Sequence, residues 1–163
     1  GGTHDVAVFD LDSDGDNDMI VSRQFVTQVW INDSVSTPCG FTQYGVGASA
    51  ANYMDLTGTG SGSVGTTATL TTTGVVAPTA FQVVSLGQTS LQLFGGVLLV
   101  DLGSQPIPMA VLAAAGGQTV WNVPLPASSA FAGLAVYFQT AAVDATQPGG
   151  FGMSNGVELV LCP

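Results

Sequence analysis

Five aspartates alternate with other residues in a short acidic segment near the start of the sequence. Gly15 lies inside this run, at the sixth position. Alternation lets a curling loop turn every second side chain inward, and glycine permits the tight turn that such a loop needs. Carboxylate oxygens are hard ligands of the kind that calcium prefers. The spacing therefore predicts a calcium-binding loop whose ligands are Asp10, Asp12, Asp14, Asp16 and Asp18.

The charge of this loop predicts that its folding depends on the ion. Neighbouring carboxylates about 5 Å apart repel by roughly 0.8 kcal/mol per pair even in water. We therefore expect the loop to open without a cation. The alternative is a solvated acidic loop without metal, which strict alternation around a glycine disfavours. An EF-hand is excluded, because its twelfth position would be a glutamate and is Val21 here.

Short apolar stretches flank the loop and predict the strands that position it. Residues 5–9 precede the acidic segment, and residues 19–22 and 25–31 follow it. Together they predict a small antiparallel unit. Isolated hairpins are marginally stable in water, so this unit must pack on the second segment or on another chain.

The pattern D-x-D-x-D-G-x-x-D between apolar strands, continued by the segment Val29 to Asp33, resembles the FG-GAP/VCBS repeats of integrin-type propellers and secreted bacterial proteins. The resemblance covers about residues 4–36. It implies that four of the aspartates bind calcium through their side chains and that Asp16 contributes its backbone carbonyl. One repeat cannot build a propeller from this chain alone. Either upstream repeats were removed, or the repeat has acquired another use.

Acidic residues divide the chain into two segments. Seven of the 11 acidic residues lie within the first 33 positions, and a turn-rich stretch from Asp33 to Pro38 follows them. We therefore predict a calcium-binding hairpin unit over residues 1–36 and a second domain over residues 37–163.

The second domain carries Val, Thr and aromatic residues between Gly and Pro breaks, a composition typical of strands. The strands are predicted at residues 64–73, 80–86, 90–94, 97–102, 108–114, 119–123, 134–142 and 157–161. Both faces of 134–142 are apolar, so this strand is expected to be central. The predicted fold is all-β, a short calcium-loop hairpin unit followed by a β-sandwich or jelly-roll-like domain.

Cys39 and Cys162 lie near the two ends of the second segment. They predict either a disulfide, which would stabilise the domain by roughly 4 to 5 kcal/mol, or two buried free thiols. We favour the disulfide, because the other features point outside the cytosol. The segment from Cys39-Gly40 to the ending Ser154–Leu161 also resembles C-terminal β domains of large exported proteins of planctomycete-like bacteria, which implies export.

Charge excludes two classes of partner. The formal net charge is -10, Arg23 is the single basic side chain apart from His4, and lysine is absent. Nucleic acids and anionic lipid surfaces both bind through Lys and Arg, so neither is expected.

No apolar run reaches the roughly 18 residues of a membrane span. The opening Gly1-Gly2, without a signal-peptide pattern, suggests a processed or trimmed chain.

Other candidate motifs favour structural interpretations. Gly60 to Gly65 fits G-x-G-x-x-G, but a strand-like segment follows where dinucleotide binding needs a helix. His4 is the sole imidazole. The remaining acids stand far apart in the sequence, at Asp55, Asp101, Asp144 and Glu158. Core packing is favoured over a sugar-stacking platform for the aromatic residues Trp30, Tyr44, Tyr53, Trp121 and Tyr137.

The favoured function is a non-enzymatic, extracellular, calcium-stabilised structural protein that self-assembles through β edges into a fibre or surface layer, as a homo-oligomer or polymer. The absence of lysine leaves strand edges unguarded. The alternative is the tail of a larger secreted propeller protein that acts in glycan binding, adhesion or sorting. A glycan hydrolase or lyase is a third, weaker hypothesis.

Overall fold

The computed structural model describes residues 3–9, 11, 17–23, 26–31, 39–47, 54–103 and 109–163. The chain divides into two compact units, Gly1–Pro38 (unit 1) and Cys39–Pro163 (unit 2). The boundary thus lies two residues beyond the one predicted from the acidic residues. Each unit is described by itself.

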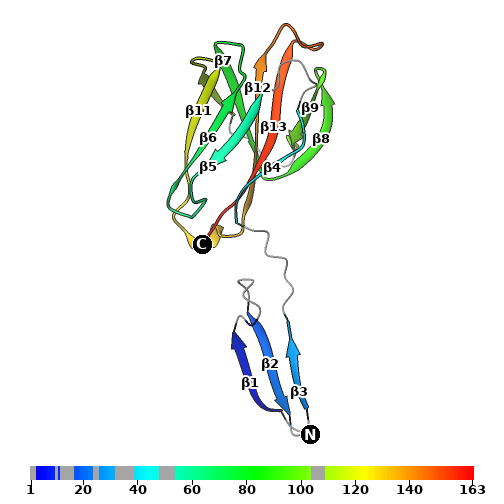
Figure 1. Cartoon of the computed structure of the whole chain (residues 1–163), viewed down its shortest axis with the longest axis vertical. Coiled ribbons are helices and arrows are strands. Elements are labelled where there is room, and N and C mark those ends of the chain that lie inside the picture. Colours follow the sequence, from blue (N-terminus) through cyan, green and yellow to red (C-terminus); the bar gives the residue numbers. More distant parts are fainter. Residues whose placement is uncertain are drawn as a thin grey trace. The chain divides into compact units, whose positions relative to one another are not determined.

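Unit 1 is a three-stranded antiparallel sheet of order β1-β2-β3, drawn in blue in Figure 1. Its strands are β1 (Thr3–Phe9), β2 (Asp18–Arg23) and β3 (Val26–Trp30). Each predicted strand of the first segment is present, and the acidic segment connects β1 to β2.

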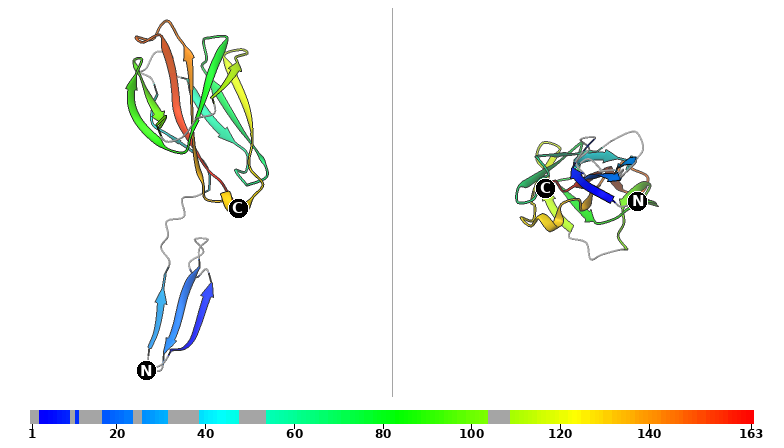
Figure 2. Two further views of the ribbon diagram at one scale, coloured as in Figure 1. Left: turned by 180° about the vertical axis from the view of Figure 1, so that it is seen from behind. Right: turned by 90° about the horizontal axis from the view of Figure 1, so that it is seen from below.

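Unit 2 contains a five-stranded sheet of order β10-β7-β12-β13-β4, a three-stranded sheet of order β11-β6-β5 and the hairpin β8-β9. Figure 2 shows the same strands from behind. Their bounds are β4 (Gly40–Tyr44), β5 (Asp55–Thr59), β6 (Thr67–Thr73), β7 (Thr79–Ser85), β8 (Gln88–Leu93), β9 (Gly96–Val100), β10 (Met109–Ala113), β11 (Gln118–Pro124), β12 (Ala135–Val143) and β13 (Phe151–Val160), with a short 3-10 helix η1 (Ser129–Phe131).

The main hydrophobic core lies between the two larger sheets of unit 2. Leu56 and Leu70 come from the three-stranded sheet, and Phe138, Val157 and Leu159 come from the five-stranded sheet. All five side chains are essentially inaccessible to solvent. Burying a side chain of this size contributes roughly 1.5 to 3 kcal/mol. The all-β, sandwich-like fold class predicted from the sequence is confirmed, and β12 is central as expected.

A polar layer crosses the interior of the sandwich. Along β12, Phe138 belongs to the main core, Ala142 belongs to a second apolar cluster, and Thr140 lies between them. The Thr140 hydroxyl donates to Gln82 Oε1 at 2.8 Å and also bonds the Thr72 hydroxyl at 2.7 Å. Buried polar groups must be paired in this way to avoid a desolvation cost.

The hairpin β8-β9 is attached to the five-stranded sheet by Gln139 of β12. The side-chain Nε2 of Gln139 donates to Val97 O at 2.8 Å and to Ser154 O at 2.9 Å, and its Oε1 accepts from Leu99 N at 2.8 Å. One buried amide therefore satisfies three backbone groups of β9 and β13.

The longest strand, β13, begins six residues before the strand predicted at 157–161. Gly152, Ser154, Asn155 and Gly156 are of residue types that favour turns, yet they lie inside the strand and are buried. The Asn155 side chain accepts from Leu56 N at 2.8 Å and donates to Leu56 O at 2.9 Å, as a neighbouring strand would. Two further strands, β4 and β5, were not predicted at all.

In the part of the chain that the structure describes, no helix is long and apolar enough to cross a bilayer.

Candidate functional site

The acidic segment is closed at its base by strand pairing. Phe9, the last residue of β1, pairs directly with Asp18, the first residue of β2. The side chain of Asp18 is 1% exposed, and its Oδ2 accepts a hydrogen bond of 2.6 Å from Leu11 N. Strand pairing thus places Phe9, which precedes the first predicted ligand in the sequence, opposite Asp18, the last predicted ligand.

The other four predicted calcium ligands, Asp10, Asp12, Asp14 and Asp16, lie outside the described residues. Within the described ranges no three His, Cys, Asp or Glu side chains gather to hold a metal ion. Of the five aspartates, that search includes Asp18 alone. Its buried, hydrogen-bonded carboxylate suits the predicted donor set, and calcium binding stays a prediction.

The sheet of unit 1 carries apolar side chains on one face, here called face A. Directly paired residues of neighbouring strands share a face. Val6 pairs with Val21, Val8 pairs with Met19, and Met19 pairs with Trp30. Val8 is 62% exposed and Trp30 is 57% exposed. Large apolar side chains on face A are therefore open to solvent in the isolated chain.

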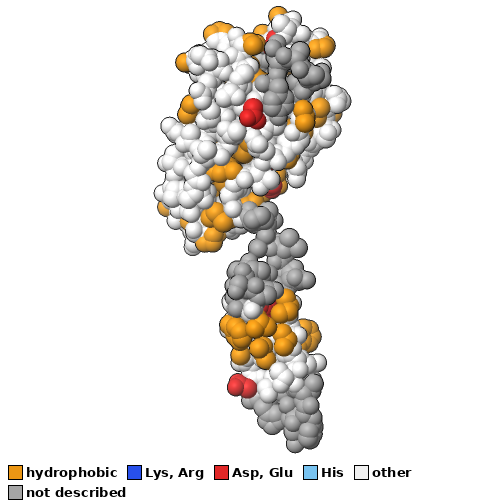
Figure 3. Space-filling model, viewed as in Figure 1, with side chains coloured by type: hydrophobic (Ala, Val, Ile, Leu, Met, Phe, Trp, Pro, Cys, Tyr) orange, Lys and Arg blue, Asp and Glu red, His pale blue; other side chains and the backbone are white. Residues whose placement is uncertain are grey.

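The opposite face of the same sheet, face B, is also apolar. Ala7 pairs with Ile20, which pairs with Val29, and Phe9 lies two residues after Ala7 on the same side of β1. Phe9 and Val29 are both exposed. Figure 3 shows hydrophobic side chains, in orange, gathered over unit 1. A sheet that covers a core with one face only would alternate apolar with polar residues, and this sheet does not.

The edges of this sheet carry few of the devices that block further pairing. β1 and β3 are the two outer strands, and neither contains Lys or Pro. Lysine and proline are common protections of an exposed edge. Both faces and both edges of unit 1 are thus suited to contact with another sheet.

Unit 2 contains the disulfide Cys39–Cys162. Cys39 immediately precedes β4, and Cys162 lies just after β13, with which β4 pairs in antiparallel register. The two Cα atoms are 5.0 Å apart. Of the two alternatives left open by the sequence, the structure forms the bridge.

The four acidic residues of unit 2 each have local structural partners. Asp55 accepts from Gln43 Nε2 at 3.2 Å, and Asp101 accepts from Gly103 N at 2.8 Å. Buried Asp144 accepts from both the backbone N and the hydroxyl of Thr146. No cluster of three acids forms among the described residues. These hydrogen bonds stabilise turns and strand contacts within unit 2.

Glu158 lies beside Tyr44 and Tyr137, whose rings pack edge to face. The Tyr44 and Tyr137 rings are 5.9 Å apart, and Tyr44 Oη donates to Leu99 O at 3.1 Å. Burial raises the pKa of Tyr44 well above 10, and the nearby Tyr137 and Glu158 raise it further. Burial also raises the pKa of Tyr137, with a hydrogen bond to Glu158 as the second cause. Both tyrosines therefore stay neutral at physiological pH.

The packing predicted for the aromatic residues is found for Trp121 and is not found for Trp30. Trp121 contacts Phe138 edge to face, with ring centroids 6.2 Å apart. Trp30 belongs to unit 1 and is exposed on face A, whereas Tyr53 lies outside the described residues. The Tyr44 and Trp121 rings instead pack on other rings.

The glycines of the G-x-G-x-x-G segment form the turn between β5 and β6. Gly60, Gly62 and Gly65 all have positive φ, at 115°, 70° and 77°. The strand β6 follows them, as the sequence indicated, so the helix N-terminus that would bind a pyrophosphate is replaced by a strand. His4 lies in β1.

An apolar cavity in unit 2 was missed by sequence analysis. It has a volume of about 390 Å³ and is lined by residues from several strands and from the region around η1. No local pattern could have predicted it, because residues of β7, β11, β12 and β13 meet there from distant parts of the sequence.

Comparisons with known protein families, curated proteins and solved structures find no match to this chain. The resemblance to FG-GAP/VCBS repeats stays an interpretation of the sequence pattern.

Proposed function

We propose that this chain is a non-enzymatic, extracellular structural module that calcium stabilises and that assembles with copies of itself through unit 1. The observation that carries the proposal is the three-stranded sheet with exposed apolar side chains on both faces. One covering layer buries only one face of a sheet. Burial of both faces therefore requires two further layers, which repeated copies of the same unit would supply.

The hydrophobic effect provides the driving force for this assembly. Val8 and Trp30 on face A, together with Phe9 and Val29 on face B, expose large apolar surfaces. Each such side chain contributes roughly 1.5 to 3 kcal/mol when it is fully buried. Contiguous apolar patches of this kind mark interaction sites in soluble proteins. Because a different face is offered on each side, the contacts need not close and a filament or layer can grow.

Calcium acts in this proposal on the connection between β1 and β2. The pairing of Phe9 with Asp18 brings the two ends of the acidic segment together. The five aspartates would repel one another in that closed loop, and a divalent cation would remove the repulsion. Calcium would therefore hold β1 and β2 in the register that creates faces A and B.

Two remaining features fit an extracellular location and assembly through strand edges. The disulfide Cys39–Cys162 is typical of proteins in an oxidising compartment. The net charge of -10 with a single Arg and no Lys leaves the edge strands without basic protection.

The test is sedimentation velocity of the whole chain over a range of concentrations, in calcium and in a chelator. Val8→Lys places a charge on face A, and Val29→Lys places one on face B. Val76→Lys is the matched control, since Val76 is an equally exposed valine in unit 2. We expect calcium-dependent assembly of the wild type and the control, and a monomer for each unit 1 variant.

Two results would count against the proposal. The first is a wild type that stays monomeric at high concentration in calcium. The second is assembly of both face variants to the same extent as the control. Electron microscopy of the calcium sample distinguishes a filament or layer from a closed oligomer.

The same two-faced sheet favours a second candidate function. A blade of a β-propeller is covered on both faces by its neighbours. In that case the chain belongs to a larger secreted protein and unit 1 packs against other repeats, with a role in glycan binding, adhesion or sorting. A chain extended by further repeats would then bind calcium as a monomer, and Val8→Lys would destabilise it without changing its oligomeric state.

A further inference from the structure

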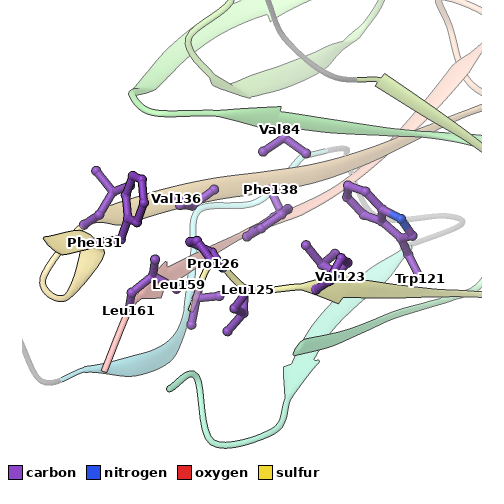
Figure 4. Close-up of a pocket in the computed structure, with 12 residues that line it drawn as sticks. Val84, Trp121, Val123, Leu125, Pro126, Phe131, Val136, Phe138, Leu159 and Leu161 are labelled. Atoms are coloured by element: carbon purple, nitrogen blue, oxygen red, sulfur yellow. The ribbon is translucent and has the colours of Figure 1, made fainter. Parts of the chain in front are cut away.

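The apolar cavity of unit 2 lies between the two sheets of the sandwich, next to η1 (Figure 4). Leu125, Phe138, Leu159 and Leu161 form buried parts of its wall. Phe131 lies at its exposed margin and is 43% accessible. The cavity is thus partly open to solvent, with buried apolar residues in its wall and an accessible margin, as in many ligand pockets.

We propose that this cavity binds a small apolar molecule, such as an alkyl chain. All 12 lining residues are aliphatic, aromatic or proline. The side chain of Trp121 supplies the one polar side-chain group of the set, its indole N–H. A ligand that buried several polar groups here would lose their hydrogen bonds to water without replacement. The part of the ligand inside the cavity must therefore be hydrocarbon.

The volume sets the size of that ligand. A cavity of about 390 Å³ is roughly two and a half times the ~150 Å³ of an engineered protein cavity that accepts benzene. It has room for roughly ten to fifteen carbon atoms. A stable protein partner would instead need about 20 to 30 residues on each side, far more than line this cavity.

The rim of the cavity disfavours the addition of a peptide strand. Pro124 and Pro126 both line it and have no backbone N–H to offer. Leu125 N already donates to Thr66 O at 2.8 Å, and Pro126 O accepts from Gly65 N at 2.9 Å. A strand depends on such backbone groups for its affinity, whereas an alkyl chain needs none.

The test measures binding of decanoate and decanol to the whole chain carrying Trp30→Phe. The sequence has two tryptophans, so Trp121 is then the single fluorescent indole and lies in the cavity wall. Val136→Phe fills the cavity from β12. Val143→Phe is the matched control, because Val143 lies in the same strand, is exposed and does not line the cavity. Circular dichroism and the melting temperature report folding of each variant.

We expect both probes to change Trp121 emission and to raise the melting temperature. Val136→Phe should weaken both probes at least about tenfold, while Val143→Phe leaves them unchanged. If Val136→Phe fails to fold, Leu134→Asn at the accessible margin of the cavity takes its place and should also weaken binding. Equal binding of decanol and decanoate supports an apolar site over a carboxylate site.

Four results would overturn the inference. The first is that neither probe affects the folded chain. The second is that the cavity variants bind the probes as tightly as Val143→Phe does. The third is that decanoate binds and decanol does not. A dimer that Val136→Phe alone dissociates would also overturn it, because the cavity would then be an interface. The inference concerns unit 2 and does not rest on assembly through unit 1.

Discussion

Units 1 and 2 differ in how they bury their apolar residues. In unit 2, Leu56, Leu70 and Phe138 are enclosed between two sheets that the unit itself supplies. In unit 1, Val21 is the one buried apolar side chain among the described residues, Met19 and Ile20 are half-buried, and large apolar side chains such as those of Val8 and Trp30 are exposed. Strand formation in both units follows from stretches rich in Val, Thr and other residues that favour strands. Stability, however, depends on cover, which unit 2 provides within itself and the sheet of unit 1 does not provide for its own two faces.

Removal of calcium should have the largest effect of all, and this effect should be confined to unit 1. Hydrogen exchange of the whole chain, followed by mass spectrometry, should show protected amides in β1, β2 and β3 with calcium and nearly complete loss of that protection in a chelator. Protection in unit 2 should not change. Asp12→Ala should reproduce the chelator result. Protection of β1 to β3 that is the same with and without calcium would contradict this comparison and the metal assignment.

Removal of the disulfide should affect unit 2 alone. Cys39→Ala combined with Cys162→Ala should lower its free energy of unfolding by roughly 4 to 5 kcal/mol, because the bridge closes most of the unit into one loop. Denaturant unfolding measures the loss. Reduction of the unaltered protein serves as the control and should give the same midpoint. A loss under about 1 kcal/mol would show that strand pairing of β4 with β13 suffices without the bridge.

Gln139→Leu should separate the hairpin β8-β9 from the five-stranded sheet. The substitution leaves Val97 O, Ser154 O and Leu99 N without their side-chain partner, at a cost of about 3 kcal/mol. Thermal unfolding and hydrogen exchange in β9 measure it. Gln88→Leu, at an exposed position of β8, is the control and should cost under about 0.5 kcal/mol. Equal losses for the two variants would refute a special role for Gln139.

The smallest expected effect concerns alkaline pH. Burial raises the pKa of Tyr44 in the folded state, so the folded chain holds this proton more tightly than the unfolded chain. The resulting stability is complete below about pH 10 and is lost as the pH rises toward the folded-state pKa. We expect the unfolding midpoint of unit 2 to fall above about pH 10 in the wild type and to fall less in Tyr44→Phe.

At neutral pH the same variant should lose about 1 kcal/mol, since the hydroxyl no longer bonds Leu99 O. An identical pH profile for the two proteins would show that Tyr44 does not cause the alkaline loss.

Local patterns predicted the strands that are rich in apolar, strand-favouring residues and failed where side chains replace backbone partners. The strand at 134–142 and the three strands around the acidic segment are present in the structure. The start of β13 was missed, because Ser154 and Asn155 favour turns until their side chains find Thr140 and Leu56. β5 was missed because its Gly and Thr residues show no apolar alternation.

The candidate site was predicted to the extent that it is local. Alternating aspartates and a glycine belong to one continuous segment, and the structure adds that Phe9 and Asp18 close its base. The apolar faces A and B were not predicted, because they arise from the register between three strands. A one-residue change of register would exchange the faces of a whole strand.

The sequence by itself determined the all-β class, the concentration of acidic residues in the first segment and the scarcity of basic residues, since these follow from residue type and short-range spacing. Tertiary structure alone decided that Cys39 and Cys162 meet, that Thr140 and Gln139 are buried and paired, and that a cavity forms beside Phe138. The physical reason is that spacing acts between neighbours in the chain, whereas burial and pairing depend on residues that only the folded sheets bring together.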